Sequence, residues 1–447
     1  MFSHSYSHES HSDVMHRGRL YALLLATSIT TAPVSALTLP EAEQRALSTD
    51  AGVQVLQAQS RAFAEQAVAA DSWMDPTLAI GTMNLPGSDI DPFNQGMFEL
   101  TLEQMLPRGE SSNIQRRKTG LQGEASGAAA ANRQLSVLRD VRLAWIERWY
   151  WQQSLQRLKD DRSLFESLVS VIESMYRQGR KSQQDLLRSE VELSRLEARI
   201  ISFQAGLSQS QAQLARWLGQ SDTHANTSGA TSSQPVINDP QPRIDNQKLL
   251  QHPRIQAADL IIRQSEQDVA LAKEGYKPQW GIAFRYGREQ GEMSTMSAPD
   301  SRNKLSAMVM MDIPLFTTNR QDRQLSASHY RHQASNAQRL DILRQLQGQL
   351  QTESARYEGL QLRSSLFRTQ LMPQVVSQSE AALTAYQVDA GNFVDVIQAY
   401  KTRLDITLED TRLQADTLQS KTKLLYLLPS RQDLQMIAQQ PIQGKTK

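Results

Sequence analysis

The residues best able to do chemistry in this chain are few and scattered. The 447-residue sequence has no cysteine, which excludes disulfides, thiolate nucleophiles and cysteine-bound metal centres. Four of its eight histidines lie in the first 16 residues, and only His329 and His332 are spaced to share a helix face as metal ligands. No carboxylate cluster accompanies that pair. We therefore expect no catalytic, cofactor-binding or metal site, no cofactor, and no enzyme activity.

Two other groups of residues could suggest chemistry, and simpler explanations are favoured for both. The methionines between residues 293 and 311 could bind soft metal ions, but flexible apolar packing explains them better. Glu99 and Glu103 could form an acid–base pair, but both alternate with apolar residues, as does Arg285. The charge balance, 48 Lys+Arg against 47 Asp+Glu, gives no reason to expect nucleic acid as a partner.

Residues 1–36 are predicted to be an export signal. A basic start precedes a mostly apolar run from Leu20 to Thr31, and Val34-Ser35-Ala36 resembles a cleavage site. The run is shorter than the roughly 20 residues that a membrane-spanning helix needs. We expect cleavage after Ala36 and export from the cytoplasm. Since the chain has no cysteine, a lipid anchor on that residue type is excluded.

The rest of the chain is predicted to contain a duplicated unit. Matching residues recur at an offset that grows from 202 to 210: Pro76 and Pro278, Tyr176 and Tyr386, Asp185 and Asp395. We expect a first repeat over 37–218, a polar linker with little fixed structure over 219–253, a second repeat over 254–428 and a C-terminal tail over 429–447. Each repeat has the same expected order of a helix, a strand pair and very long helices.

The strand pairs are predicted at 76–106 and 278–314, where apolar and polar residues alternate. Pro86-Gly87-Ser88-Asp89 marks the turn within the first pair. The strands are about ten residues long, as needed to cross a bilayer in a tilted barrel. Glu99, Glu103 and Arg285 are expected on the lumen side of such a barrel.

Long helices are predicted at 110–218 and 317–428. No glycine or proline occurs from Ala128 to Gln178. Leucine and isoleucine recur every seven residues from Leu186 to Leu214, and the same period returns from Ile397 to Leu425. This period predicts narrow apolar seams that pack as coiled coils.

These parts predict a shared barrel. Four strands cannot close a barrel, and an open sheet edge cannot face lipid because its backbone groups would be unpaired. Two copies would give eight strands and a filled interior, whereas three copies would give twelve strands and a channel. We therefore expect an α+β membrane protein with a two-fold internal repeat and four transmembrane strands. A trimer would form a 12-stranded β-barrel continued by an α-helical periplasmic tunnel.

Several motifs, in this order, resemble the TolC family of outer-membrane efflux ducts over nearly all of the mature chain. They are Leu39-Pro40-Glu41-Ala42, Asp75-Pro76, Gln104-Met105-Leu106-Pro107-Arg108-Gly109, Leu371-Met372-Pro373 and Asn392-Phe393-Val394-Asp395-Val396. Asp75-Pro76 with Asn84-Leu85-Pro86 is most similar to the CzcC-like heavy-metal branch. The resemblance implies a homotrimer in the bacterial outer membrane, in contact with its lipid. It also implies a periplasmic adaptor and an inner-membrane pump, here of the RND type, as partners.

By the same resemblance, the functional residues lie in two turns between long helices. Asp185 and Tyr386 match an interhelical gate bond, and Asp395 matches an acidic ring at the constriction. The residues expected to contact the adaptor are Gly179, Arg180, Ser182, Gly391 and Asn392. The sequence departs from the family pattern at Gly391 and Gln398, which replace a basic and an acidic residue. The alternative is two ordinary helical hairpins with Asp185 and Asp395 as helix caps.

The function expected from the sequence is a passive exit duct of a tripartite efflux system, for heavy-metal cations. Two alternatives stay open. The same duct could serve drug efflux or type I protein secretion. The chain could also be a soluble periplasmic coiled-coil adaptor without membrane strands.

Overall fold

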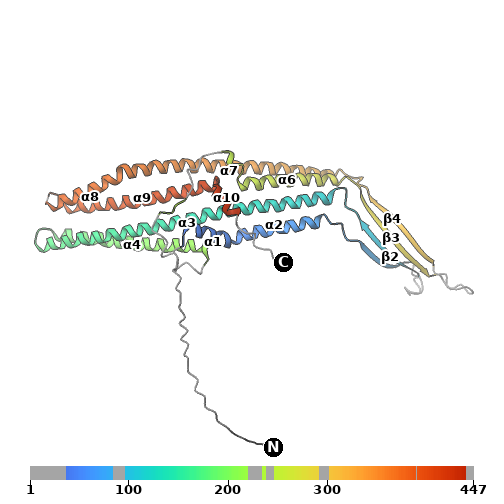
Figure 1. Cartoon of the computed structure of the whole chain (residues 1–447), viewed down its shortest axis with the longest axis horizontal. Coiled ribbons are helices and arrows are strands. Elements are labelled where there is room, and N and C mark those ends of the chain that lie inside the picture. Colours follow the sequence, from blue (N-terminus) through green and yellow to red (C-terminus); the bar gives the residue numbers. More distant parts are fainter. Residues whose placement is uncertain are drawn as a thin grey trace, which may run out of the picture. The chain divides into compact units, whose positions relative to one another are not determined.

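The computed structural model describes residues 37–83, 96–219, 234–237, 246–290, 302–388 and 390–438. The predicted export signal, the turn at 86–89 and the motif Asn84-Leu85-Pro86 lie outside these ranges. Long helices make up most of the described chain, and one four-stranded sheet continues from one end of them (Figure 1). None of the described helices is both long enough and apolar enough to cross a membrane.

The two halves of the chain have the same order of elements. The first contains α1 (Leu39–Thr49), α2 (Ala51–Ala70), β1 (Thr77–Met83), β2 (Gly96–Met105), α3 (Ser111–Arg177) and α4 (Gln183–Leu218). The second contains α5 (Asn246–Leu249), α6 (Pro253–Glu274), β3 (Gln279–Gln290), β4 (Arg302–Asp312), α7 (Gln321–Leu366), the π-helical turn η2 (Phe367–Leu371), α8 (Met372–Gln387), α9 (Phe393–Leu427) and α10 (Arg431–Ala438).

The longest helical runs of the two halves have equal lengths. α3 has 67 residues. α7, η2 and α8 continue one another from Gln321 to Gln387, and both ends of this run lie 210 residues after the ends of α3. Pro314 lies only 207 residues after Pro107, so the second half gains its three extra residues between Pro314 and the start of α7. These two long runs are therefore in constant register with each other.

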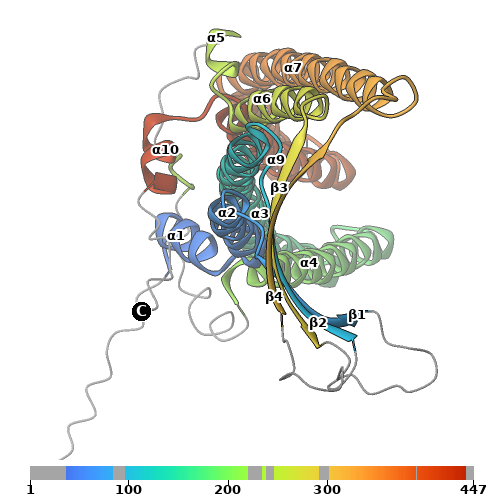
Figure 2. The ribbon, with the colours of Figure 1, turned by 90° about the vertical axis from the view of Figure 1, so that its right-hand side faces the viewer.

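The sheet is antiparallel throughout, in the order β1-β2-β3-β4, as a single curved layer (Figure 2). Its register puts Ile80, Leu100, Tyr286 and Leu305 in one row across the strands. The next row, on the other face, contains Ala79, Thr101, Arg285 and Ser306. The predicted strands and their alternation are confirmed.

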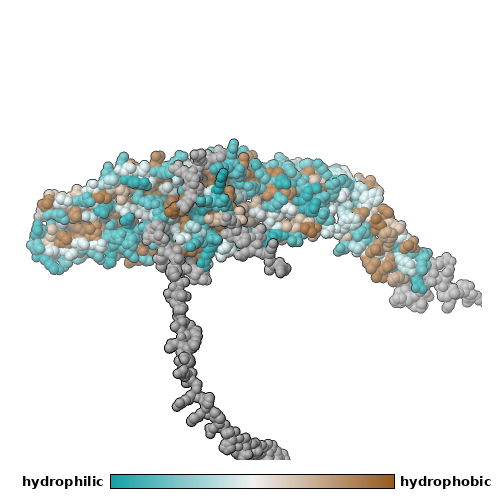
Figure 3. Space-filling model, in the orientation of Figure 1, coloured by the Kyte–Doolittle hydropathy of each residue, from teal (hydrophilic) through white to brown (hydrophobic). Residues whose placement is uncertain are grey.

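One face of the sheet is apolar and exposed. Away from the ends of the strands, this face consists of Leu78, Ile80, Leu100, Leu102, Ile282, Phe284, Tyr286, Leu305, Ala307 and Val309. Leu305 is 80% exposed, which is unusual for an apolar side chain in a folded chain. Figure 3 shows hydrophobic residues gathered over the strands.

The helices pack through the apolar seams that the heptads predict. Leu196 and Leu214 of α4 are buried, as are Ile397, Leu404 and Leu425 of α9. The largest buried cluster draws side chains from α3, α4, α8 and α9. The predicted apolar seams are confirmed, and small polar residues such as Ser189 and Ser210 of α4 are buried together with them.

Part of the segment expected to be a loosely structured linker is packed instead. Ile237 packs against the buried cluster of Ile146, Trp149 and Ala415, and its carbonyl accepts a hydrogen bond of 3.0 Å from Lys421 Nζ. Leu249 of α5 is fully buried. These isolated apolar residues in a polar segment give it contacts that its average composition does not predict.

Candidate functional site

The turn between α3 and α4 depends on Gly179. Gly179 has φ +70°, a left-handed conformation that glycine adopts without strain. The N–H of Arg180 donates to the carbonyl of Met175 at 2.9 Å, and the N–H of Gly179 donates to that of Tyr176 at 2.9 Å. These bonds close the last turn of α3 in the way common at helix ends. Gly179 thus permits the reversal that the sequence predicts.

Gly391 serves the second turn in a different way. It is not among the described glycines with positive φ. A Cβ atom added there would lie 3.2 Å from the Cβ of Ala385 and 3.3 Å from its carbonyl carbon. A side chain at Gly391 would therefore crowd the end of α8, which glycine can approach closely.

Both helices that leave the turns begin with a polar cap. The N–H of Asp185 donates to Ser182 Oγ at 3.2 Å, and the Ser182 hydroxyl donates to Asp185 Oδ2 at 2.8 Å. The N–H of Asp395 donates to Asn392 Oδ1 at 2.9 Å. The alternative that Asp185 and Asp395 are the caps is wrong, because Ser182 and Asn392 are the N-caps. Both aspartates lie in the first helical turn, where the helix dipole favours negative charge.

Tyr386 lies at the contact between the two helical hairpins. Only 2% of it is exposed, and its hydroxyl donates to Met175 Sδ at 3.7 Å. Its ring centroid lies 5.9 Å from that of Phe393 and 4.4 Å from Lys181 Nζ. The carboxylate of Asp185 accepts from Ser182, so the described contacts of Asp185 and Tyr386 are not with each other. The gate roles of Asp185 and Tyr386 stay a prediction.

The remaining predicted tip residues lie at the surface. Asp395 is exposed in the first turn of α9. Arg180 and Ser182 of the first turn and Asn392 of the second turn are also exposed. The turns lie at the same end of the helices, away from the sheet (Figure 1). This end therefore presents the residues that a partner could reach.

The polar face of the sheet has an ion pair. Arg285 Nε lies 2.8 Å from Glu99 Oε1, which also accepts from the Thr101 hydroxyl at 3.0 Å. Glu103 lies on the same face, four residues after Glu99 in β2. The grouping of these charges opposite the apolar face agrees with the alternation in the sequence.

The metal alternatives gain no support from the geometry. Within the described ranges, no group of three or more His, Asp or Glu side chains could hold a metal ion. His332 Nδ1 lies 2.9 Å from the Ser265 hydroxyl, and its Nε2 lies 3.2 Å from Asn336 Nδ2. Met105 and Met310 converge over Gly281, where a Cβ atom would be 2.6 Å from Met105 Sδ. These methionines fill the space that the glycine leaves.

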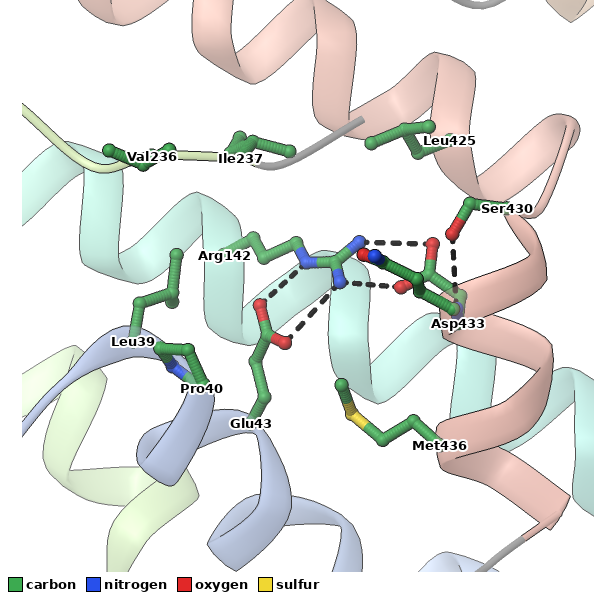
Figure 4. A pocket seen from close by; sticks show the side chains of 11 residues that line it. Leu39, Pro40, Glu43, Arg142, Val236, Ile237, Leu425, Ser430, Asp433 and Met436 are labelled. Atoms are coloured by element: carbon green, nitrogen blue, oxygen red, sulfur yellow. Dashed lines mark hydrogen bonds and ion pairs between the residues drawn. The ribbon is translucent and has the colours of Figure 1, made fainter. Parts of the chain in front are cut away.

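Sequence analysis missed a buried ionic cluster that joins both ends of the described chain (Figure 4). Arg142 of α3 lies 2.7 Å from Glu43 of α1 and 2.5 Å from Asp433 of α10. All three side chains are buried, beside a cavity of about 190 Å³. Burial opposes the charge of Arg142, but the two carboxylates outweigh it and raise its pKa. One signal was available: Arg142 shares a helix face with the apolar residues Leu138 and Trp145.

His252 was also missed, and it joins the start of α6 to α9. It is fully buried, and its Nδ1 accepts a hydrogen bond of 3.2 Å from the N–H of Arg254. Its Nε2 lies 3.2 Å from the carbonyl of Tyr426 and must therefore bear the proton. Burial lowers the pKa of His252 to about 4, although the bond to Tyr426 acts in the opposite direction.

Comparison with known proteins identifies the fold. No protein-family model and no curated protein matches the chain. A membrane protein from Pseudomonas aeruginosa matches in structure with a TM-score of 0.75 at 16% identity, over 88% of this chain and 91% of that one. CusC, a protein known to form a transmembrane channel, matches with a TM-score of 0.75 at 15% identity, over 88% and 92%. The chain has the TolC fold.

The outer membrane protein VceC from Vibrio cholerae has the same TolC fold, with a TM-score of 0.73 at 16% identity over 87% of this chain and 95% of VceC. The resemblance to the TolC family is thus confirmed at the level of the fold.

Proposed function

We propose that the chain is one subunit of a bacterial outer-membrane efflux duct. The observation that carries this proposal is the exposed apolar face of the sheet. Its strands are 7 to 12 residues long, and the opposite face carries Glu99, Glu103 and Arg285. A sheet with one apolar and one polar face suits a wall between lipid and a water-filled lumen.

The same sheet supports a homotrimer. Of the described strands, β1 and β4 each pair on one side, so their outer edges carry backbone groups without a strand partner. Such edges cannot face lipid. Three copies, with β4 of one subunit beside β1 of the next, would close a 12-stranded barrel with a channel.

The long helices would continue this barrel as a tunnel through the periplasm. Their apolar seams are narrow and their other faces are polar, as a tube with water on both sides requires. The turns at the far end would form the constriction, with Asp185, Tyr386 and Asp395 as gate residues. Gly179, Arg180, Ser182, Gly391 and Asn392 would meet a periplasmic adaptor, with an inner-membrane pump below it. The duct would be a passive passage without catalysis.

The cargo and the pump of such a duct can be proposed from the sequence. We propose heavy-metal cations and a pump of the RND type, on the resemblance of Asp75-Pro76 and Asn84-Leu85-Pro86 to the CzcC-like branch. A strain lacking the gene, compared with its parent on metal salts and on drugs, tests this. Greater sensitivity of the deletion strain to metals supports the proposal. Greater sensitivity to drugs alone would show that the cargo is drugs and not metal cations.

Membrane fractionation tests the duct itself. The mature protein is expected in the outer-membrane fraction, extractable only with detergent, and trimeric by native mass spectrometry. It should then conduct ions when added to planar bilayers. A water-soluble monomer obtained without detergent would disprove the proposal and favour the periplasmic adaptor.

A further inference from the structure

A contact between Lys181 and Tyr386 joins the two helical hairpins at their tips. Lys181 belongs to the turn between α3 and α4, whereas Tyr386 belongs to the end of α8. The ammonium nitrogen lies 4.4 Å from the centroid of the ring, within the roughly 6 Å of a cation–π contact. Tyr386 is almost fully buried, and this attraction is strongest where water is excluded.

Packing fixes the position of the ring. Tyr386 belongs to the apolar cluster that draws side chains from α3, α4, α8 and α9. Phe393 lies beside its ring, and Met175 of the first hairpin accepts from its hydroxyl. Because the ring is held in place, the ammonium group of Lys181 meets a preformed surface.

The duplication does not repeat this contact. At the offset of 210 residues, Tyr176 is the counterpart of Tyr386, and Gly391 is the counterpart of Lys181. Tyr176 is 40% exposed, and Gly391 has no side chain to place over a ring. The contact is therefore made once, between the turn of the first hairpin and the end of α8 in the second, and has no equivalent in which the two halves are exchanged.

We propose that Lys181 is a closing residue of the duct, which holds the tips of the two hairpins together through the ring of Tyr386. This proposal rests on the proposed function. Tips that separate to widen the constriction must break the contact, so its loss favours the open duct. The gate bond expected from the sequence uses the hydroxyl of Tyr386, whereas this contact uses the ring, and the two can be separated by substitution.

Single-channel conductance of the purified full-length protein in planar bilayers tests the proposal. Lys181→Met keeps the aliphatic stem and removes the charge, and Tyr386→Leu removes the ring. Each is expected to raise conductance by about twofold or more, since each removes the cation–π contact. Lys181→Arg keeps a cation that binds rings and should conduct as the wild type does. Tyr386→Phe keeps the ring and removes only the hydroxyl, so its conductance measures the expected gate bond separately from the cation–π contact.

Two controls separate the contact from general effects. Arg188→Gln removes a positive charge from the exposed surface of α4 near the tip and should leave conductance unchanged. The double variant Lys181→Met/Tyr386→Leu should conduct no more than either single variant, because both substitutions remove the same cation–π contact. Circular dichroism melting curves show which variants fold.

The opposite pattern overturns the proposal. Wild-type conductance in Lys181→Met and Tyr386→Leu would show that the contact does not hold the tips. A rise in Tyr386→Phe alone would assign closure to the hydroxyl instead. A wild-type protein that forms no channel would contradict the proposed function, and this outcome is measured without any substitution.

Discussion

The lowered pKa of His252 makes the stability of this protein depend on pH in a window that begins well above that of the carboxylates. Above pH 6.5 the imidazole is neutral in both the folded and the unfolded chain. Between pH 6.5 and about 4 the unfolded chain binds a proton that the folded chain does not, so the free energy of unfolding falls as pH falls. The pKa values of Asp50 and Glu274 are lowered from 3.8 and 4.5, so their contributions are lost at lower pH.

We expect the wild type to lose about 3 kcal/mol of stability between pH 7 and pH 4 through His252. Urea unfolding at several pH values measures this loss. His252→Asn keeps an acceptor for the N–H of Arg254 but does not titrate. It should be less stable at pH 7 and show a flatter profile below pH 6.5. If the free energy of unfolding depended on pH equally in the wild type and in His252→Asn, the loss of stability could not be assigned to His252.

The residues at the tips show what a sequence can and cannot predict. The recurrence of Tyr176, Asp185, Tyr386 and Asp395 locates both turns, because a repeated spacing needs only the chain itself. It does not give their hydrogen bonds. Whether Ser182 or Asp185 caps α4 depends on side-chain directions within one turn. Whether an ammonium group lies over the ring of Tyr386 depends on how two hairpins pack.

At the scale of elements, the cluster of Arg142 joins α1, α3 and α10. Glu43 and Asp433 lie 99 and 291 residues from Arg142 in sequence, so no local pattern connects them. Each carboxylate faces a guanidinium that cannot lose its proton. The ends of the described chain are thus tied to the middle of the longest helix.

We expect Arg142→Met to lower the free energy of unfolding by about 3–5 kcal/mol, because it leaves two buried carboxylates without a counterion. The triple variant Glu43→Gln/Arg142→Met/Asp433→Asn should recover much of this loss. Arg162→Met serves as the matched control, since Arg162 pairs with Glu166 and Glu197 on the surface. It should cost less than about 1 kcal/mol in the same urea titration. Equal effects of Arg142→Met and Arg162→Met would show that burial does not matter here.

The two faces of the sheet predict opposite responses to the same substitution at neighbouring positions. Ala307 lies in the apolar row of Phe284 and Leu102, whereas Met308 lies in the row of Ala283 and Glu103. Ala307→Arg should cost about 2–4 kcal/mol in the bilayer, where a charge on the lipid face is unfavourable. Met308→Arg should be tolerated.

The yield of folded protein in outer-membrane fractions, together with urea titration in liposomes, measures the difference. Similar losses for Ala307→Arg and Met308→Arg would contradict the assignment of one face to lipid and the other to the lumen. The sequence could predict these faces because alternation with period two is local to each strand. The pairing of β2 with β3 could not be predicted in the same way, since their residues lie some 180 positions apart.

At the scale of the whole molecule, the outer edges of the sheet are expected to pair between subunits, with β4 of one beside β1 of the next. The chain has no cysteine, so introduced cysteines report on one contact only. Ala79→Cys in β1, combined in turn with Ser306→Cys or Met308→Cys in β4, should give covalent dimers and trimers on oxidation of the assembled protein. All three residues lie on the polar face.

Ala79→Cys alone should remain monomeric on denaturing gels under the same conditions. Monomers from both double variants, with trimers still present before denaturation, would disprove the pairing of β1 with β4 between subunits. Sequence reasoning reached this arrangement because four strands of membrane length leave few ways to satisfy the backbone. It could not give the register between subunits, which depends on side-chain fit across the new edge.

The equal lengths of α3 and of the run from Gln321 to Gln387 have a geometric consequence. At 1.5 Å per residue, each of these 67-residue rods is roughly 100 Å long. Since both start beside the sheet, both hairpins of the proposed duct would reach the same depth below the membrane. In a threefold assembly, the six turns between the long helices would then lie in one plane at the end of the tunnel. A partner docking from below would meet an even rim.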